Sequence, residues 1–306
     1  MATERSRAFV PGHVTAFFSA HPDPDPAVAG SRGAGVTLTD GVETLVVPDA
    51  DDHAAESRAE NPSGGDGGAP TVTLDGEETT MGVVDDVLDA LGVRTAADHV
   101  ALASDVPVGA GFGVSGAAAL GTALAANEAF DLGRSENELV RIAHVAEVER
   151  GTGLGDVVAQ ARGGVPIRIE PGAPGHGELD GIPTTARVEY VTFGELSTEA
   201  VLAGDTTTLS DAGERALTRL RRDPRPATLM AASREFAADA DLLVSEVDAA
   251  IDDVTAAGGS ASMAMLGRTV FALGAGLSAA GYDPSVCHTH VTGARLVDDA
   301  SRSSRR

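Results

Sequence analysis

The chain has 306 residues, with 46 acidic residues against 22 basic ones and a net charge of −24. All the basic residues are arginine. Walker A phosphate loops, Schiff-base enzymes and protein kinases of the usual type all need a lysine and are therefore excluded. The acidity argues against a nucleic-acid partner. Without an apolar leader or span, we expect a cytoplasmic protein that makes no membrane contact.

The excess of carboxylates points to a particular solvent. At molar salt the Debye length falls to roughly 3 Å, so surface carboxylates repel each other weakly, whereas in dilute buffer they would destabilise the fold. We therefore expect a salt-adapted protein of the kind that extreme halophiles among the archaea make. The single cysteine, Cys287, excludes an intramolecular disulfide. Cys287, His288 and His290 lack a third ligand nearby, so no metal is expected there.

Short apolar and β-branched runs predict strands in the first third of the chain. The first run, 6–10, is expected at a sheet edge because a Pro-Gly turn follows it. Further strands are predicted at residues 36–38, 44–47, 71–74 and 99–106. Residues 49–70 are acidic, rich in Gly, Ser and Pro, and without periodicity, which predicts a flexible loop.

Helical periodicity begins after this loop. Helices are expected at residues 81–91, 115–130, 135–150, 156–161, 211–222 and 227–256. Further strands are expected at residues 165–169, 187–193 and 286–297. Residues 171–183 resemble a connection between domains, so the length predicts two domains, 1–178 and 179–306.

The strongest site pattern is Pro-x-Gly-x-Gly-x-Gly-x-Ser-Gly-Ala over residues 107–117. Alternate glycines let backbone N–H groups face a ligand, and a helix N-terminus follows, which predicts an anion site that needs no lysine. Ser115 is placed to offer its hydroxyl to a phosphate or to Mg²⁺. A dinucleotide fingerprint, GxGxxG, is also present, but Asp131 follows a helix rather than a strand. An ordinary turn capped by serine is the remaining alternative.

This pattern resembles the signature loop of the GHMP kinases, the family of galactokinase, homoserine kinase and mevalonate kinase. Two further family elements have matches, at residues 151–164 and 258–263. Together with residues 11–18, 30–35, 262–271 and 293–296, they look like the pantoate kinases of archaea, and of haloarchaea in particular. The resemblance implies a two-domain α+β fold, with an N-terminal domain like ribosomal protein S5 domain 2 and a ferredoxin-like C-terminal domain.

The resemblance also implies an activity, transfer of the γ-phosphoryl group of ATP to the 4-hydroxyl of (R)-pantoate in coenzyme A biosynthesis. ATP would be held by Pro107, Gly109, Ala110, Gly111, Phe112, Gly113, Val114, Ser115, Gly116 and Ala117. Ser115 and Glu147 would hold Mg²⁺, with Glu149 as a competitor for that role. Asp156 would take the proton from the acceptor hydroxyl, although it could instead cap the helical turn that follows.

The acceptor carboxylate needs a cation, and only arginine is available. Arg32 is the candidate, with Gly33 and His13 as further substrate-binding residues; Arg268 and Arg295 are weaker candidates. A surface role for Arg32 and a structural role for His13 are the alternatives. Another small-molecule GHMP kinase, acting on mevalonate, homoserine or shikimate, or a non-catalytic nucleotide-binding regulator would fit the same motifs. Assembly as a homodimer is plausible for the family.

Overall fold

The structure is a computed structural model that describes residues 5–49, 69–194, 206–265 and 267–298. Most of the predicted loop 49–70 lies outside these residues. The strands of the larger sheet are β1 (Ser6–His21), β2 (Gly30–Pro48), β3 (Thr71–Leu74), β4 (Glu77–Glu78), β5 (Ala97–Ser104), β6 (Val165–Glu170), β7 (Glu178–Ile182) and β12 (Arg295–Leu296). Those of the smaller sheet are β8 (Arg187–Thr192), β9 (Ala261–Ala264), β10 (Thr269–Leu273) and β11 (Ser285–His288).

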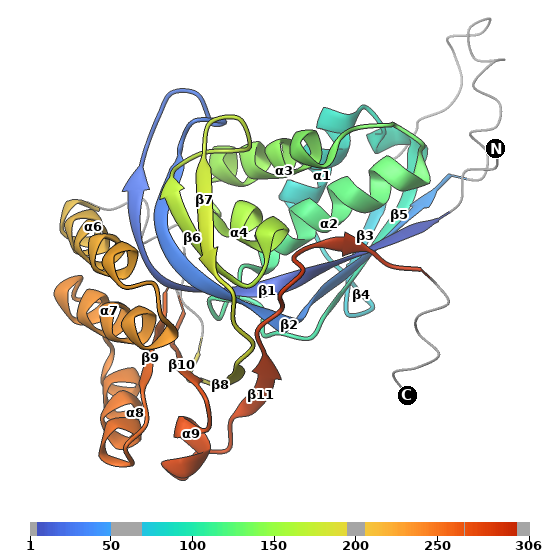
Figure 1. The fold of residues 1–306 in the computed structure, drawn as a ribbon. Helices are drawn as coiled ribbons and strands as arrows, with labels where there is room; N and C mark the ends of the chain where they lie inside the picture. The colour runs from blue at the N-terminus through green and yellow to red at the C-terminus, as the bar shows by residue number, and fades with distance from the viewer. Residues whose placement is uncertain (1–4, 50–68, 195–205, 266, 299–306) are drawn as a thin grey trace, which may run out of the picture.

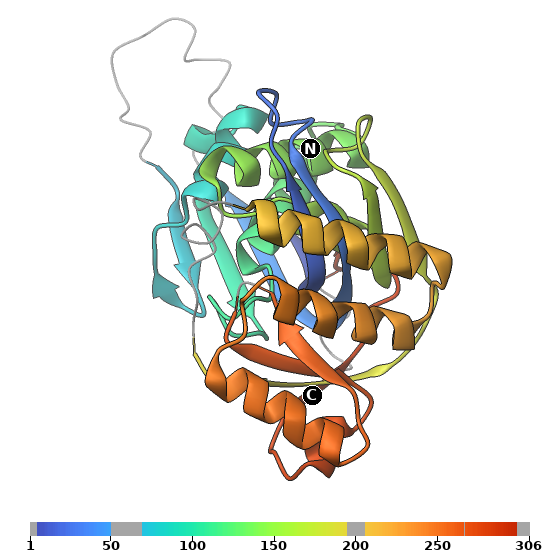
Figure 2. The same cartoon turned by 90° about the vertical axis from the view of Figure 1, so that its left-hand side faces the viewer.

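Helices cover both sheets. They are α1 (Gly82–Leu91), α2 (Val114–Ala129), α3 (Glu136–Arg150), α4 (Asp156–Arg162), α6 (Thr207–Arg222), α7 (Pro226–Asp239), α8 (Ser245–Ala256) and α9 (Gly276–Ala279), with a 3₁₀ turn at Arg94–Ala96. The larger sheet has the order β12-β1-β2-β5-β3-β4, with β6 on β2 and β7 on β6, and the smaller one has the order β11-β8-β10-β9 (Figure 1). Helices α6, α7 and α8 line one side of the molecule (Figure 2).

The first strand is longer than the sequence predicts. It runs on through Pro11, which pairs with Gly41, and its register with β2 shifts between Pro11 and His13. A bulge tolerates a proline because the ladder loses a donor there in any case. The strand is also internal, between β12 and β2, so the edge position predicted for residues 6–10 is wrong.

Two other predicted elements are divided. The helix expected over 227–256 is α7 and α8, with Asp241 between them at a φ of 54°, a left-handed conformation that ends a helix. The strand expected over 286–297 is β11 in the smaller sheet and β12 in the larger one, with Gly293 at a φ of 68° between them.

The domain boundary predicted after residue 178 stays a prediction. It falls within β7, which pairs with β6 in the larger sheet, and β12 returns to that sheet at the other end of the described chain. Sheet membership therefore favours a division after Ile182 in which β12 belongs with the N-terminal part.

The core is built from small side chains. Helix α2, which packs on β1 and β2 and on helices α1 and α3, buries Ala117, Ala118, Ala119 and Leu120. A Cβ at Gly121 would overlap the Thr44 side chain on β2, so this glycine permits a close approach of helix and sheet. Close backbone packing compensates for the near absence of aromatic residues and fixes the position of the N-terminus of α2.

Candidate active site

The glycine loop ahead of α2 has the conformation that its sequence predicts. Gly109, Gly111 and Gly113 have φ values of 73°, 89° and 64°, in the left-handed region that other residues avoid. Gly113 is the N-cap of α2 and has no side chain with which to cap it. The first N–H groups of α2 are therefore left for a ligand, at the end of the helix that favours an anion.

The loop is anchored by its side chains and presents its backbone. Ala110 and Phe112 are buried, and the Phe112 ring packs on Tyr190 of β8 with centroids 4.7 Å apart. Thr269 of β10 donates a hydrogen bond of 2.8 Å to the Ala110 carbonyl. A Cβ at Gly111 would lie 3.0 Å from the Met265 carbonyl. The smaller sheet therefore holds the loop through Tyr190, Met265 and Thr269, and none of these three contacts comes from the 258–263 turn.

Glu147 of α3 has a buried carboxylate that lies beside the N-terminus of α2. Its side chain accepts hydrogen bonds from Ser115 Oγ and, at 2.7 Å, from Thr152 Oγ1. Burial raises the pKa of Glu147 to about 7, because the hydrogen bonds from Ser115 and Thr152 only partly offset the loss of water and nearby Asp156 opposes ionisation. Glu149, the competing candidate, is exposed on the same helix.

This corner suits Mg²⁺ chemically. A buried carboxylate gains from a divalent ion, and Mg²⁺ prefers one or two carboxylates together with phosphate oxygens and water. Across the described residues there is no group of three or more His, Cys, Asp or Glu side chains that could hold a metal ion. The Ser115 hydroxyl and the Glu147 carboxylate, which are hydrogen-bonded to each other, are the oxygens that could bind Mg²⁺ at this corner.

Asp156 begins α4, and its carboxylate is held by strand β1. Its Oδ1 atom lies 2.6 Å from His13 Nδ1 and 3.5 Å from Thr15 Oγ1. Burial opposes ionisation of Asp156, but the His13 hydrogen bond and the charge of Arg168 outweigh it and lower the pKa of this carboxyl. The predicted cap is absent, since the N-cap of α4 is Gly155 and makes no side-chain hydrogen bond.

Arg168 on β6 is the functional candidate that the sequence reading missed. Its side chain is 2% exposed, and its Nε and Nη1 atoms have no hydrogen-bond partner among the described residues. Burial lowers the pKa of Arg168, against the attraction of Asp156. Gly155 makes room for the guanidinium, because a Cβ there would lie 2.6 Å from Arg168 Nε. The sequence does carry a signal for this residue. In the strand sequence VPIRIE, Arg168 is a single cation among apolar residues that precede and follow it.

A pocket joins these groups. Its lining residues are Thr15, Phe18, Ser31, Gly153, Leu154, Gly155, Asp156 and Arg168. It thus combines a carboxylate, a guanidinium, two hydroxyls and an apolar wall. Ser31 and Thr15 come from β2 and β1, and residues 153–155 come from the turn between α3 and α4.

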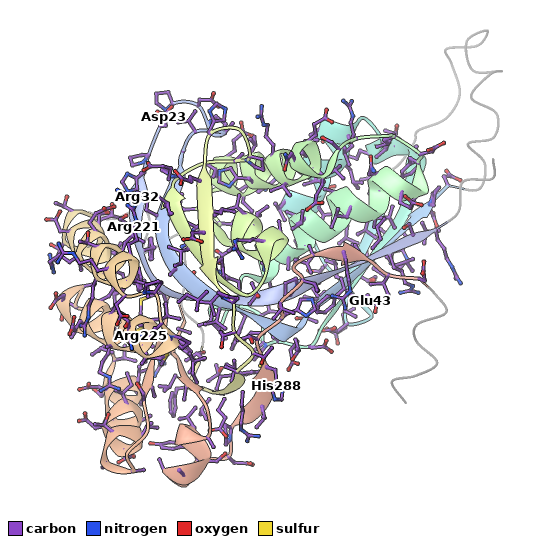
Figure 3. All side chains as sticks on the ribbon, viewed as in Figure 1. Asp23, Arg32, Glu43, Arg221, Arg225 and His288 are labelled. Atoms are coloured by element: carbon purple, nitrogen blue, oxygen red, sulfur yellow. The ribbon has the colours of Figure 1, made fainter. Side chains whose placement is uncertain are left out.

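Arg32 and Gly33, the predicted substrate-binding residues, are not among the residues that line this pocket. Arg32 donates to the Ile169 carbonyl at 2.7 Å and to Glu214 of α6 at 2.8 Å, and it lies beside that helix (Figure 3). Gly33 is the register partner of Arg168 on β6. Because side chains alternate along a strand, Arg32 points away from the face that Arg168 occupies.

The two weaker arginine candidates also have other partners. Arg268 pairs with Glu246 at 2.7 Å, and Arg295 lies 5.0 Å from the centre of the Phe9 ring. Neither lines the pocket. Cys287 is buried in β11.

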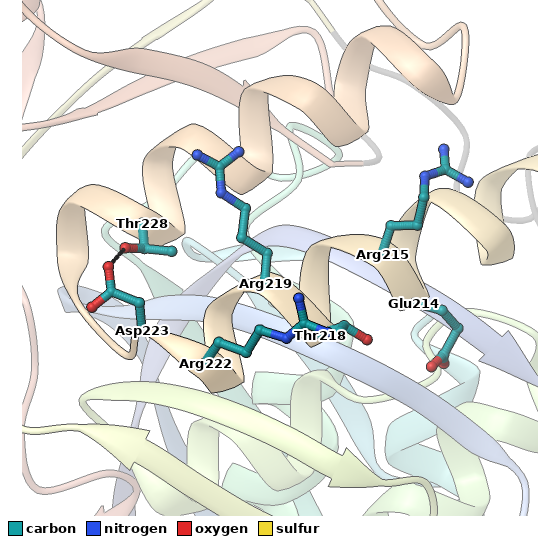
Figure 4. Close-up of a pocket in the computed structure, with 7 residues that line it drawn as sticks. All are labelled: Glu214, Arg215, Thr218, Arg219, Arg222, Asp223 and Thr228. Carbon is teal, nitrogen blue, oxygen red and sulfur yellow. Dashed lines mark hydrogen bonds between the residues drawn. The ribbon is translucent and has the colours of Figure 1, made fainter.

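A groove along α6 carries several arginines (Figure 4). Arg215 pairs with Asp239 at 2.7 Å and Arg219 pairs with Glu235, so these side chains link α6 to α7. Thr228 donates to Asp223 at 2.7 Å at the turn between the two helices. The groove is explained by helix packing.

Among the described residues, no helix has the length and apolarity needed to cross a bilayer.

Comparison with known proteins agrees with this geometry. A family model for the GHMP kinase N-terminal domain matches residues 78–164. A pantoate kinase of Thermococcus kodakarensis is 37% identical over 87% of this chain and 87% of its own length. Another, from Methanospirillum hungatei, is 30% identical over 90% of this chain and 89% of its own. A solved phosphotransferase related to the coenzyme A biosynthesis pathway has a TM-score of 0.82 and 29% identity, covering 96% of this chain and 99% of its own.

The two sheets, the glycine loop and the pocket beside Asp156 define a phosphotransferase of the GHMP type. The chain belongs to the GHMP kinases and, within them, to the pantoate kinase family. The predicted α+β fold is thereby confirmed.

Proposed function

We propose that this chain transfers the γ-phosphoryl group of ATP to the 4-hydroxyl of (R)-pantoate, a step of coenzyme A biosynthesis. The observation that carries the proposal is the pocket beside the glycine loop. Both Asp156 and Arg168 line it, and the Nε and Nη1 atoms of Arg168 have no partner among the described residues. The membership of the pantoate kinase family supports the same acceptor.

Pantoate matches this lining group by group. Arg168 would bind the acceptor carboxylate, because a guanidinium matches a carboxylate with two parallel donors. Phe18 and Leu154 offer an apolar wall to the geminal methyl groups. The Ser31 hydroxyl, which donates to the Leu154 carbonyl at 3.3 Å, can accept a hydrogen bond from the 2-hydroxyl. Homoserine is disfavoured, since its ammonium group would lie near the Arg168 cation. Shikimate lacks the methyl groups that would use the apolar wall.

The nucleotide side of the reaction rests on positioning and charge neutralisation. Backbone N–H groups of residues 109–116 would hold the ATP phosphates, with Ser115 and Glu147 holding Mg²⁺. That ion supplies neutralisation of the charge on the β- and γ-phosphates. Asp156, with its pKa held low, would accept the proton of the acceptor hydroxyl.

The remaining features of the proposal concern the setting of the enzyme. We infer a salt-adapted cytoplasmic enzyme of a halophilic archaeon from the charge of −24 and the absence of lysine. Assembly as a homodimer stays a prediction that a sizing experiment in molar KCl would check.

The deciding experiment is a coupled assay for ADP release in molar KCl, with pantoate, mevalonate, homoserine and shikimate offered separately. Turnover is expected with pantoate, and Asp156→Asn is expected to bind ATP while losing roughly 100-fold or more in kcat. Turnover with another acceptor alone would contradict the substrate assignment. Binding of ATP without turnover of any acceptor would favour a nucleotide-binding regulator.

A further inference from the structure

His13 connects the two halves of the site. Its main-chain N–H donates to the Phe112 carbonyl of the glycine loop at 2.9 Å, and its Nδ1 lies 2.6 Å from Asp156 Oδ1. The side chain is fully buried, and His13 is not among the residues that line the acceptor pocket. It therefore contacts the groups expected to act on the substrates without facing the pocket itself.

The local sequence places this ring. The register shift between Pro11 and His13 turns the histidine inward from β1. Gly35 on the neighbouring strand leaves the space that the ring fills, because a Cβ there would overlap the imidazole. A bulge and a glycine on two strands are thus both needed to bring one imidazole nitrogen to Asp156.

The surroundings determine which atom carries the proton. His13 Nε2 is buried and has no partner among the described residues, so an N–H there would be left unsatisfied. Burial and the nearby Arg168 charge lower the pKa of His13 and outweigh the raising effect of Asp156. The ring is therefore neutral, with its one hydrogen on Nδ1 and donated to the carboxylate.

We propose that His13 is a positioning residue that orients the Asp156 carboxylate toward the acceptor and ties it to the glycine loop. Oδ1 accepts the hydrogen bonds from His13 and Thr15, and among the described residues no side chain donates to Oδ2. Oδ2 is therefore the atom left for the acceptor hydroxyl. The inference rests on the proposed function and adds to it a residue that touches neither substrate.

The charged and titratable groups that face Asp156 come from three elements. They are the charged Arg168 on β6 and two titratable groups, the neutral His13 on β1 and Glu147 on α3. Of these, only His13 donates a hydrogen bond to the carboxylate. The His13 hydrogen bond is one of the causes that lower the pKa of Asp156, so losing this donor raises that pKa. Because Asp156 must be ionised to accept a proton, the acid limb of the kcat/KM profile then moves to higher pH.

The test compares His13→Leu, which fills the space without a donor, with His13→Asn, whose amide places a donor where Nδ1 lies. His13→Leu is expected to lower kcat roughly 10- to 100-fold, the range of one hydrogen bond to a charged group. Its acid limb should move to higher pH while the affinity for an ATP analogue stays unchanged. His13→Asn should restore most of kcat and the original limb. His99→Asn, which removes a histidine hydrogen-bonded to Thr73 at 2.9 Å on β3, is the control and should behave as wild type.

The outcomes separate the inference from the proposed function. Equal losses in His13→Leu and His13→Asn with an unmoved acid limb would show a purely structural role and overturn the inference, as would a normal His13→Leu enzyme. If His13→Leu does not fold, the result for His13→Asn decides. A lowered kcat together with an acid limb moved to higher pH in His13→Asn would contradict the positioning role. A wild-type enzyme that turns over no acceptor would overturn the proposed function as well.

Discussion

At the scale of single residues, the two arginines on neighbouring strands differ in what surrounds them. Arg32 has an acidic partner, Glu214, and a carbonyl acceptor. Arg168 has neither for its Nε and Nη1 atoms within the described residues, although it is almost completely buried. A buried cation whose donors have no acceptors destabilises the fold. Such a group is expected where an anionic ligand binds and supplies the missing acceptors.

Replacing Arg168 tests this difference. Arg168→Met is expected to raise the KM for pantoate roughly 10- to 100-fold, because the carboxylate loses hydrogen bonds to a charged group. The free energy of unfolding of the unliganded variant should be equal to that of wild type or higher by about 1–3 kcal/mol, because the burial of two donors without partners outweighs the attraction of Arg168 to Asp156. Steady-state kinetics and urea unfolding at fixed KCl measure both quantities.

Arg32→Met is the matched control for that variant. It removes the ion pair with Glu214 and should lower the free energy of unfolding while leaving the KM for pantoate near wild type. A raised KM in Arg32→Met beside a normal one in Arg168→Met would assign the carboxylate to Arg32 instead.

At the scale of elements, the junction of the glycine loop with α2 makes the nucleotide site. Gly113 ends the loop in a left-handed conformation and leaves the helix without a side-chain cap. Gln160 on α4 donates to the Gly113 carbonyl at 2.9 Å and so joins the loop to the helix that begins with Asp156. A Cβ on Gly113 would lie 3.1 Å from Gln160 Nε2 and 3.2 Å from Asp156 Cβ, tighter than ordinary contact.

Two glycine-to-alanine variants separate strain from function. Gly113→Ala and Gly133→Ala both place alanine at a φ near 63°, so each should lose about 1–2 kcal/mol of unfolding free energy. Gly113→Ala alone should also raise the KM for ATP, because it disturbs the loop next to Asp156. Gly133 has open space around it and follows the other end of α2. Equal KM values for ATP in the two variants would contradict the assignment of the loop.

At the scale of the whole molecule, the charge of −24 sets the conditions under which the fold is stable. Many of the ion pairs are surface contacts, such as Arg215–Asp239 and Arg225–Asp223, and such pairs contribute little. Repulsion among unpaired carboxylates opposes the compact state, and salt screens it. The buried Ala, Val and Leu core is the main stabilising contribution.

Unfolding temperature and ATP affinity should both rise from dilute buffer to molar KCl. Screening reduces the repulsion among the carboxylates and between them and the nucleotide phosphates. Differential scanning calorimetry and equilibrium binding across a KCl series measure the two effects. Sucrose is the control, since it favours compact states without screening charge. Full stability and affinity in dilute buffer would refute the salt adaptation.

Several features followed from short stretches of sequence. The glycine loop, the start of α2 and the capping box of Ser135 and Glu138 depend on neighbouring residues, so local conformational preferences determine them. Residue chemistry likewise predicted that phosphate binding rests on backbone N–H groups, a helix N-terminus, Mg²⁺ and arginine, since the chain has no lysine.

Only the tertiary structure decided which side chains meet across the chain. His13 and Asp156 are 143 positions apart, and the choice of Arg168 over Arg32 depends on the register of β6 on β2. A shift of one residue moves a side chain to the other face of a sheet, and that register is set by the packing of the whole core. The kinase chemistry was therefore evident in the sequence, whereas the proposed acceptor-binding arginine and the role of the histidine emerged only from the fold.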